Sequence, residues 1–336
     1  MNQGPVPVVL GQTAVGKTSV AIELSLLLRG EVISADAMQV YREMKLATAK
    51  PSEAERRGVP HHLMDFLDLD EPYSVVRFRN LALELIPEIR RRGRLPLVVG
   101  GSALYIKALV DGLSSGPAPD EAYRRRLEME EKKHGRGYLL RRLLELDPET
   151  GRRLHPHDLK RIIRALEVLE LTGQTISSQQ VHWDGEDPRR GPARDAGGDT
   201  LPPEYVRARA PVSDFFLIGL RRAPEDLEKR IVERIDGMLA DGLLEETREL
   251  IRMGARDHRV AWQALGYKEI ERCLEGECTL EEARSNLISA TRRFAKRQMT
   301  WWKKDERIRW VPIDSGEAPA VVAERVAGLI RAALGE

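Results

Sequence analysis

The sequence is poor in the residues that would place it in several large classes of protein. Its 336 residues include two cysteines, Cys273 and Cys278, and no nearby set of further cysteines or histidines at zinc spacing accompanies them. The sequence therefore predicts neither a disulfide framework nor a structural zinc site. No apolar run approaches the roughly 18 residues that span a bilayer, and no basic-then-apolar leader pattern opens the chain. We expect a cytoplasmic monomer that does not enter a membrane.

A net charge of one sign is also missing. The formal net charge is only +1, so a polyanionic partner would have to be bound by local clusters of cations. The hydrophobic content of 42% and the charged content of 32% are typical of a globular protein. The length allows one large domain with an insertion, or two domains.

A complete phosphate-binding pattern, G-x-x-x-x-G-K-T, begins at residue 11, after an apolar run and before a helix-like stretch. Such a loop requires this order of strand, loop and helix. Its glycines let backbone N–H groups converge on an anion, Lys17 adds a charge, and the Thr18 hydroxyl can hold Mg²⁺. The loop does not say which phosphate compound it holds, or whether phosphate is transferred or leaves. The expected binding residues are Gly11, Gln12, Thr13, Ala14, Val15, Gly16, Lys17 and Thr18.

Short apolar runs suited to buried parallel strands alternate with helical patterns. This alternation predicts an α/β fold with a P-loop NTPase-like parallel sheet core. The expected strands are residues 6–10, 31–35, 95–99 and 215–220.

The strand signal disappears in the middle of the chain, where charged helical stretches occupy residues 120–133, 138–146 and 158–171. We predict a helical insertion domain at 114–205, and a core with basic C-terminal helices formed by 1–113 and 206–336. Residues 184–203 are rich in Gly, Pro, Asp and Arg, which predicts a mobile linker.

Open α/β sheets bind ligands at the carboxyl ends of their strands. Asp36 follows the second expected strand, and Gly100, Gly101 and Ser102 follow the third. Asp36 should therefore face the same crevice as the phosphate loop. From the residues alone it is a magnesium ligand, a general base, or a carboxylate that caps the next helix.

Arg234 interrupts an apolar stripe on the helix expected at residues 224–240. An unpaired buried charge costs several kcal/mol, so this arginine needs an anionic partner. An internal Asp or Glu and a ligand phosphate are both possible, and the phosphate loop in the same core favours the ligand.

Acidic residues are absent from positions 285–304, although this stretch carries Arg292, Arg293, Lys296, Arg297, Lys303 and Lys304. On a helical projection, Leu280, Leu287 and Phe294 fall on the side opposite to Arg292, Lys296 and Lys303. A solvated helix face usually mixes charges of both signs, so this face suits a nucleic-acid backbone, with Trp301 and Trp302 available for stacking. The alternative is an unusually charged surface helix. A second basic group lies in the insertion, and His61 and His62 are expected to be structural.

With these residues in view, the chain closely resembles the tRNA dimethylallyltransferases, also called tRNA isopentenyltransferases, of the bacterial type. The matching segments follow the family's order from about residue 8 to residue 304: 11–18, 36–41, 48–51, 61–63, 100–105, 158–169, 230–234, 264–267 and 290–301. Family members often have Ser where this chain has Ala37, and Thr where it has Ser102, which keeps the hydroxyl.

The resemblance implies transfer of a dimethylallyl group from dimethylallyl diphosphate to N6 of the adenosine 3′-adjacent to the anticodon, in tRNAs that read codons beginning with U. Diphosphate leaves, and Mg²⁺, held by Thr18, is the implied cofactor. By the same resemblance, Asp36 takes the N6 proton, Ser102 assists at that atom, and Arg234 contacts the diphosphate. The segments implied to contact the anticodon stem-loop of tRNA are Asp36, Ala37, Met38, Gln39, Ser102, Arg124, Lys160, Arg161, Ile162, Ile163, Arg164, Gln263, Ala264, Leu265, Gly266, Tyr267, Lys268, Lys296, Arg297, Gln298, Met299, Thr300, Trp301, Trp302 and Lys303.

Three other functions share some of these features. A P-loop small-molecule kinase would not need the basic helix. A nucleotide-gated RNA-binding protein would leave Asp36 and Ser102 without a task. A prenyltransferase acting on free AMP would not need so extensive a basic surface.

Overall fold

A computed structural model of the chain describes residues 4–112, 117, 120–180, 215–258 and 260–335. They form two compact units, Met1–Asp111 with Val212–Glu336 and the intervening Gly112–Pro211. We call these the core unit and the insertion unit. The linker predicted at 184–203 lies outside the described residues.

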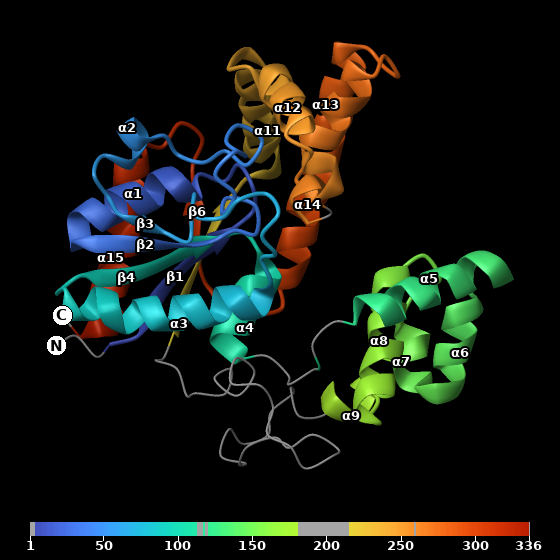
Figure 1. Cartoon of the computed structure of the whole chain (residues 1–336). Helices are drawn as coiled ribbons and strands as arrows, with labels where there is room; N and C mark the ends of the chain where they lie inside the picture. Colours follow the sequence, from blue (N-terminus) through green and yellow to red (C-terminus); the bar gives the residue numbers. More distant parts are fainter. Residues whose placement is uncertain (1–3, 113–116, 118–119, 181–214, 259, 336) are drawn as a thin grey trace. The chain divides into compact units, whose positions relative to one another are not determined.

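The core unit is built on a six-stranded parallel sheet with the strand order β3-β2-β4-β1-β5-β6 (Figure 1). The strands are β1 (Val6–Gly11), β2 (Gly30–Ala35), β3 (His61–His62), β4 (Leu95–Gly100), β5 (Phe215–Arg222) and β6 (Arg309–Ile313). The predicted α/β class and its four strands are confirmed. Every residue of β1 and β2 is buried, which explains the apolar run of β1 and the Val32 and Ile33 pair of β2; Glu31 and Ser34 of β2 are buried polar residues.

Helices cover both faces of the sheet. The helix α1 packs with α15 and α3 packs with α4. The connection through α1 runs from β1 to β2, and the connection through α3 runs from β3 to β4, in the opposite direction along the strand order. Because such connections are right-handed, these two pairs of helices lie on opposite faces of the sheet. The helices of the core unit are α1 (Lys17–Leu28), α2 (Glu53–Arg56), α3 (Val75–Arg91), α4 (Ala103–Asp111), α11 (Pro224–Ala240), α12 (Leu243–Arg252), α13 (Tyr267–Leu274), α14 (Leu280–Trp302) and α15 (Pro319–Leu334).

The long helix α14 connects two parts of the core unit. It packs against α11 and α13 in its first half, and it contacts β1 and α4 further along (Figure 1). Thr279 and Glu282 form a capping box at its start. Leu280, the first residue of the helix, was expected on the apolar side with Leu287, but it is 43% exposed.

The insertion unit is helical in its described part, as predicted. Its helices are α5 (Glu121–His134), α6 (Tyr138–Leu146), α7 (Pro148–Arg153), α8 (Leu159–Thr172) and α9 (Ile176–Gln180). Leu127, Leu139, Leu143, Ile162 and Leu166 belong to its own buried cluster, separate from that of the core unit.

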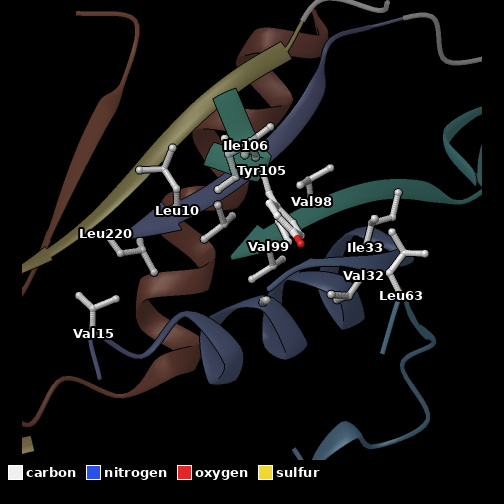
Figure 2. Close-up of a cluster of buried hydrophobic side chains, with 14 of the residues drawn as sticks. Leu10, Val15, Val32, Ile33, Leu63, Val98, Val99, Tyr105, Ile106 and Leu220 are labelled. Atoms are coloured by element: carbon white, nitrogen blue, oxygen red, sulfur yellow. The ribbon is translucent and has the colours of Figure 1, made fainter. Parts of the chain in front are cut away.

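Apolar side chains of the core unit fix the position of the phosphate loop. Figure 2 shows Val15, which lies in the loop itself, below Leu10 of β1 and Leu220 of β5. All three side chains are completely buried. Val15 therefore anchors the loop to the sheet.

No helix in the described ranges is long and apolar enough to cross a membrane.

Candidate active site

The phosphate loop connects β1 to α1 at the carboxyl end of the sheet. Gly11 has φ +151°, and a Cβ at this position would lie 2.8 Å from the carbonyl oxygen of Leu220, so only glycine fits. Gly16 and Ala14 are also left-handed, with φ of 102° and 63°. The loop leads directly into the N-terminus of α1, where free N–H groups and the helix dipole favour the binding of an anion.

Two arginines hold the loop through its carbonyl groups. Arg222 Nε donates to the Val15 carbonyl at 2.9 Å, and Arg230 Nε donates to the Ala14 carbonyl at 3.0 Å. Arg222 is itself held by an ion pair of 2.7 Å with Asp226. Side chains from β5 and α11 thus set the curvature of the loop.

Lys17 is half-buried, and its Nζ donates to the carbonyls of Gly11 at 3.0 Å and Gln12 at 2.7 Å. The pKa of Lys17 is lowered to about 7, mainly by burial and also by the charge of Arg234, while the charge of Asp36 acts in the opposite direction. Burial also lowers the pKa of Arg234, again opposed by Asp36. Lys17 and Arg234 therefore lie close to each other in a poorly solvated environment.

Arg234 forms no ion pair with any carboxylate of the described chain. The internal partner considered from the sequence is thus not found among these residues. Of the two partners considered for Arg234, the bound anion remains, because a poorly solvated guanidinium without an ion pair is costly.

Asp36 follows β2, and its Oδ1 accepts hydrogen bonds from the backbone N–H groups of Met38 at 2.8 Å and Gln39 at 3.3 Å. This oxygen closes a turn and does not cap a helix, because the next helix, α2, begins only at Glu53. Oδ2 has no hydrogen-bond partner within the described ranges. One oxygen orients the carboxylate, and the other is available for a proton or a cation.

Ser102 lies beside this turn. Its Oγ accepts a hydrogen bond of 3.3 Å from the N–H of Ala37, so its own proton is free to be donated. The ends of β2 and β4 approach closely here, because a Cβ on Gly100 would lie 2.1 Å from the Ala35 carbonyl oxygen. The sequence predicted this meeting of Asp36 and Ser102 from the ends of two strands.

A small cavity of about 50 Å³ opens between these elements. Cationic and oxygen-bearing side chains form one part of its lining, and apolar side chains form the other. Its residues are Lys17, Thr18, Ala21, Val32, Ser34, Asp36, Gln39, His61, Met64, Val99, Gly100 and Gly101.

His61 was expected to be structural, yet it lines this cavity. Its Nδ1 contacts the Val59 carbonyl at 2.8 Å, which leaves Nε2 as an acceptor, and burial lowers its pKa. His62 pairs with Glu31 at 2.7 Å and is structural, as predicted. The alternation of side chains along β3, opposite Val32 of β2, is the signal that separates the two histidines.

The basic face of α14 is confirmed in most of its residues. Arg293, Lys296, Arg297 and Lys303 are exposed and form no ion pair with the part of the chain that the structure describes. Arg292 differs, because it pairs with Glu228 of α11.

Two residues at the end of α14 do not face solvent as expected. Trp302 is 4% exposed, so its ring packs in the core, whereas Trp301 is 50% exposed and can stack. Gln298 is 5% exposed. Its Oε1 accepts from the Thr13 N–H at 2.8 Å, and its Nε2 donates to the Gly101 carbonyl at 2.9 Å.

The predicted contact segment at 263–268 is mostly internal. Ala264, Gly266 and Tyr267 are buried, and the Tyr267 hydroxyl donates to Glu246 at 2.7 Å. Gln263 and Lys268 are exposed and can reach a partner.

In the insertion unit, two of the residues predicted to contact tRNA form ion pairs with a buried glutamate. Arg124 and Arg164 bind the completely buried Glu167 at 2.8 and 2.7 Å. A buried carboxylate requires such partners, so these arginines stabilise the unit. Ile162 and Ile163 are buried in its core, whereas Lys160 and Arg161 are exposed.

Comparison with known proteins identifies close relatives. The family model described as IPP transferase matches residues 39–305, and the model described as isopentenyl transferase matches residues 5–71. A tRNA dimethylallyltransferase of Symbiobacterium thermophilum is 43% identical over 97% of this chain and 95% of its own length. Another, of Geobacillus kaustophilus, is 42% identical over 95% and 94%.

Solved structures of similar fold include proteins of the same kind. The tRNA isopentenylpyrophosphate transferase of Bacillus halodurans is 35% identical, with a TM-score of 0.68 over 99% of this chain and 97% of that one. A eukaryotic dimethylallyltransferase acting on tRNA is 28% identical, with a TM-score of 0.70 over 92% of this chain and 74% of that one.

Proposed function

The chain belongs to the IPP transferase family, and from this membership we propose that it transfers a dimethylallyl group from dimethylallyl diphosphate to tRNA. The acceptor is N6 of the adenosine on the 3′ side of the anticodon, in tRNAs that read codons beginning with U. The observation that carries the proposal is the pair of cations, Lys17 and Arg234, beside a carboxylate with one free oxygen. An anionic leaving group would neutralise the two cations, and a nucleophile that gives up a proton would supply the carboxylate with that proton.

The phosphate loop binds the diphosphate. As N6 attacks the allylic carbon, the carbon–oxygen bond breaks and its electron pair goes to the diphosphate. Backbone N–H groups at the start of α1, with Lys17 and Arg234, stabilise the charge that grows there. The guanidinium groups of Arg222 and Arg230 keep the loop in the required curve.

Asp36 accepts the N6 proton. Its Oδ1 is held by two backbone N–H groups, which leaves Oδ2 to act as the base. The Ser102 hydroxyl, oriented by the Ala37 N–H, can donate to the adenine and hold it against the carboxylate. Because the exocyclic amine of adenine is a weak nucleophile, this orientation should contribute much of the rate.

The oxygen donors at the cavity fit Mg²⁺. Thr18 supplies a hydroxyl and Asp36 a carboxylate, and Mg²⁺ is usually bound by one or two protein ligands together with substrate phosphates and water. The described residues include no group of three or more His, Cys, Asp or Glu that could hold a metal by themselves. When bound, Mg²⁺ would neutralise charge on the diphosphate, with Thr18 as its ligand.

The exposed cations of α14 support an RNA as the acceptor, because such side chains can bind RNA phosphates. A base inside a stacked anticodon loop has to be extruded to reach a buried carboxylate. Phosphate contacts through Lys296, Arg297 and Lys303 would hold the RNA during that step.

The test is an incubation of the full chain with dimethylallyl diphosphate and Mg²⁺, followed by mass spectrometry of nucleosides. Separate reactions contain unmodified tRNA, AMP, or ATP with candidate acceptors. We expect adenosine to gain one C5H8 unit in tRNA alone, and digestion should map it to the 3′ side of the anticodon. Prenylated AMP, or phosphate transfer from ATP, would contradict the proposal.

A further inference from the structure

Gln298 connects three parts of the candidate active site. Its side chain belongs to α14, binds the N–H of Thr13 in the phosphate loop, and binds the carbonyl of Gly101 at the end of β4. A second buried bond joins the same elements, because Gln12 Nε2 donates to the Ala295 carbonyl at 3.0 Å. The phosphate loop is therefore attached to α14 at two successive residues.

The space around Gln298 is filled. A Cβ on Gly101 would lie 2.5 Å from Gln298 Nε2 and 3.5 Å from Lys17 Nζ. The amide thus fits between the turn that precedes Ser102 and the loop that carries Lys17. A displacement of the amide would change the position of Thr13 relative to Gly101.

The basic residues Lys296 and Arg297 immediately precede Gln298 on the same helix, and both are exposed. A helix moves as a stiff element over so short a distance. A polyanion held by these side chains would therefore restrain the buried amide on the other face.

We propose that Gln298 is a positioning residue through which RNA binding on α14 and diphosphate binding in the phosphate loop favour each other. The proposal rests on the function proposed above. An RNA that restrains α14 reduces the conformational freedom that the loop must lose when it binds diphosphate. The effect is reciprocal, so diphosphate should increase RNA affinity by the same factor.

The experiment measures affinity for inorganic diphosphate with Mg²⁺, by calorimetry, with and without an anticodon stem-loop RNA. We expect RNA to strengthen diphosphate binding in the unaltered chain by roughly 5- to 100-fold. In Gln298→Met, which keeps the volume but removes both hydrogen bonds, the factor should fall close to one. Asn286→Ala is the matched control, because Asn286 is an exposed amide earlier on the same helix and should keep the full factor.

A purely structural role would lower the melting temperature and weaken each ligand, but it would leave the ratio of the two diphosphate affinities unchanged. An unchanged ratio in Gln298→Met, or a ratio of one in the unaltered chain, overturns the proposal. If Gln298→Met does not fold, Gln298→Glu replaces it. That variant keeps an acceptor for Thr13, places a carboxylate oxygen against the Gly101 carbonyl, and should also lower the ratio. Absence of prenylated tRNA with the unaltered chain would instead refute the proposed function.

Discussion

Arg234 lowers the pKa of Lys17, adding to the larger effect of burial, and the two together bring that pKa to about 7. Neither cation has a carboxylate ion-pair partner in the described ranges, and the charge of Asp36 only partly compensates them. The site is therefore prepared for an anion. This relationship leads to predictions about pH, catalysis and stability.

Diphosphate affinity should depend on pH through Lys17. The charged form binds an anion better, and with a pKa of about 7 in the free protein that form is lost as pH rises through neutrality. Binding should weaken from pH 6.5 to 8.5, by up to about tenfold per unit above the pKa. Titration calorimetry at several pH values would measure it, and Lys17→Met should remove this part of the dependence. An identical slope in both proteins would exclude Lys17 as its source.

Removing either cation should impair catalysis without releasing the RNA. Lys17→Ala or Arg234→Ala should reduce kcat/KM by roughly 10²-fold or more, since both stabilise charge on the leaving group. Steady-state kinetics and tRNA binding would be measured together. Unchanged kinetics in Arg234→Ala would refute its assignment.

Replacing Arg234 should not destabilise the fold. Arg234→Met removes a poorly solvated cation that has no ion-pair partner within the described chain, so thermal stability should be kept or raised while turnover is lost. Calorimetric melting provides the measurement. A large decrease in the melting temperature would point to an internal partner instead.

The base assignment predicts a separation of turnover from binding. Asp36→Asn keeps an oxygen for the N–H groups of Met38 and Gln39, so both substrates should still bind while turnover falls by about 10²- to 10⁴-fold. Single-turnover kinetics would measure the chemical step. Asp36→Ala, which also loses the hydrogen bonds to these two N–H groups, should in addition destabilise the turn. If Asp36→Asn loses diphosphate affinity and extra Mg²⁺ restores it, Asp36 is mainly a metal ligand.

The salt dependence of tRNA binding tests the basic face of α14. Each phosphate contact contributes roughly −0.7 to −0.9 to the slope of log K against log salt. Changing Lys296 and Arg297 to Gln should flatten the slope by up to about two contacts and leave diphosphate affinity unchanged. Arg292→Gln is the control, since Arg292 pairs with Glu228 and should alter the slope less. Equal slopes in all three proteins would mean that the face is only a solvated surface.

The sequence predicted the parts of the fold that have a strong local pattern. β1, β2, β4 and β5 each contain a short run of buried apolar residues, and the strand ends then indicated Asp36 and Ser102. The edge strands β3 and β6 were not predicted. β3 has two residues, and the first residue of β6, Arg309, is exposed, so neither forms an apolar run.

Tertiary partners that the sequence did not indicate hold several of the candidate site residues. Arg124 and Arg164 resemble exposed RNA contacts in sequence, yet they bind Glu167, and the partner of Arg124 lies 43 residues away. The bonds from Gln298 to Thr13 and Gly101 span 285 and 197 residues. No local pattern indicates such bonds, and the place of His61 at the cavity follows from the pairing of β3 with β2, a strand that the sequence did not predict.

The separate buried cluster of the insertion unit affects how loss-of-function variants are understood. A domain with its own apolar core can lose its structure while its neighbour remains folded. A substitution at Glu167 or Leu143, both completely buried, could thus abolish tRNA modification in a chain whose diphosphate site is intact. In such a variant, low activity would report the fraction of molecules in which the insertion unit is folded. Inactivity caused by misfolding and inactivity caused by lost chemistry therefore have to be distinguished unit by unit.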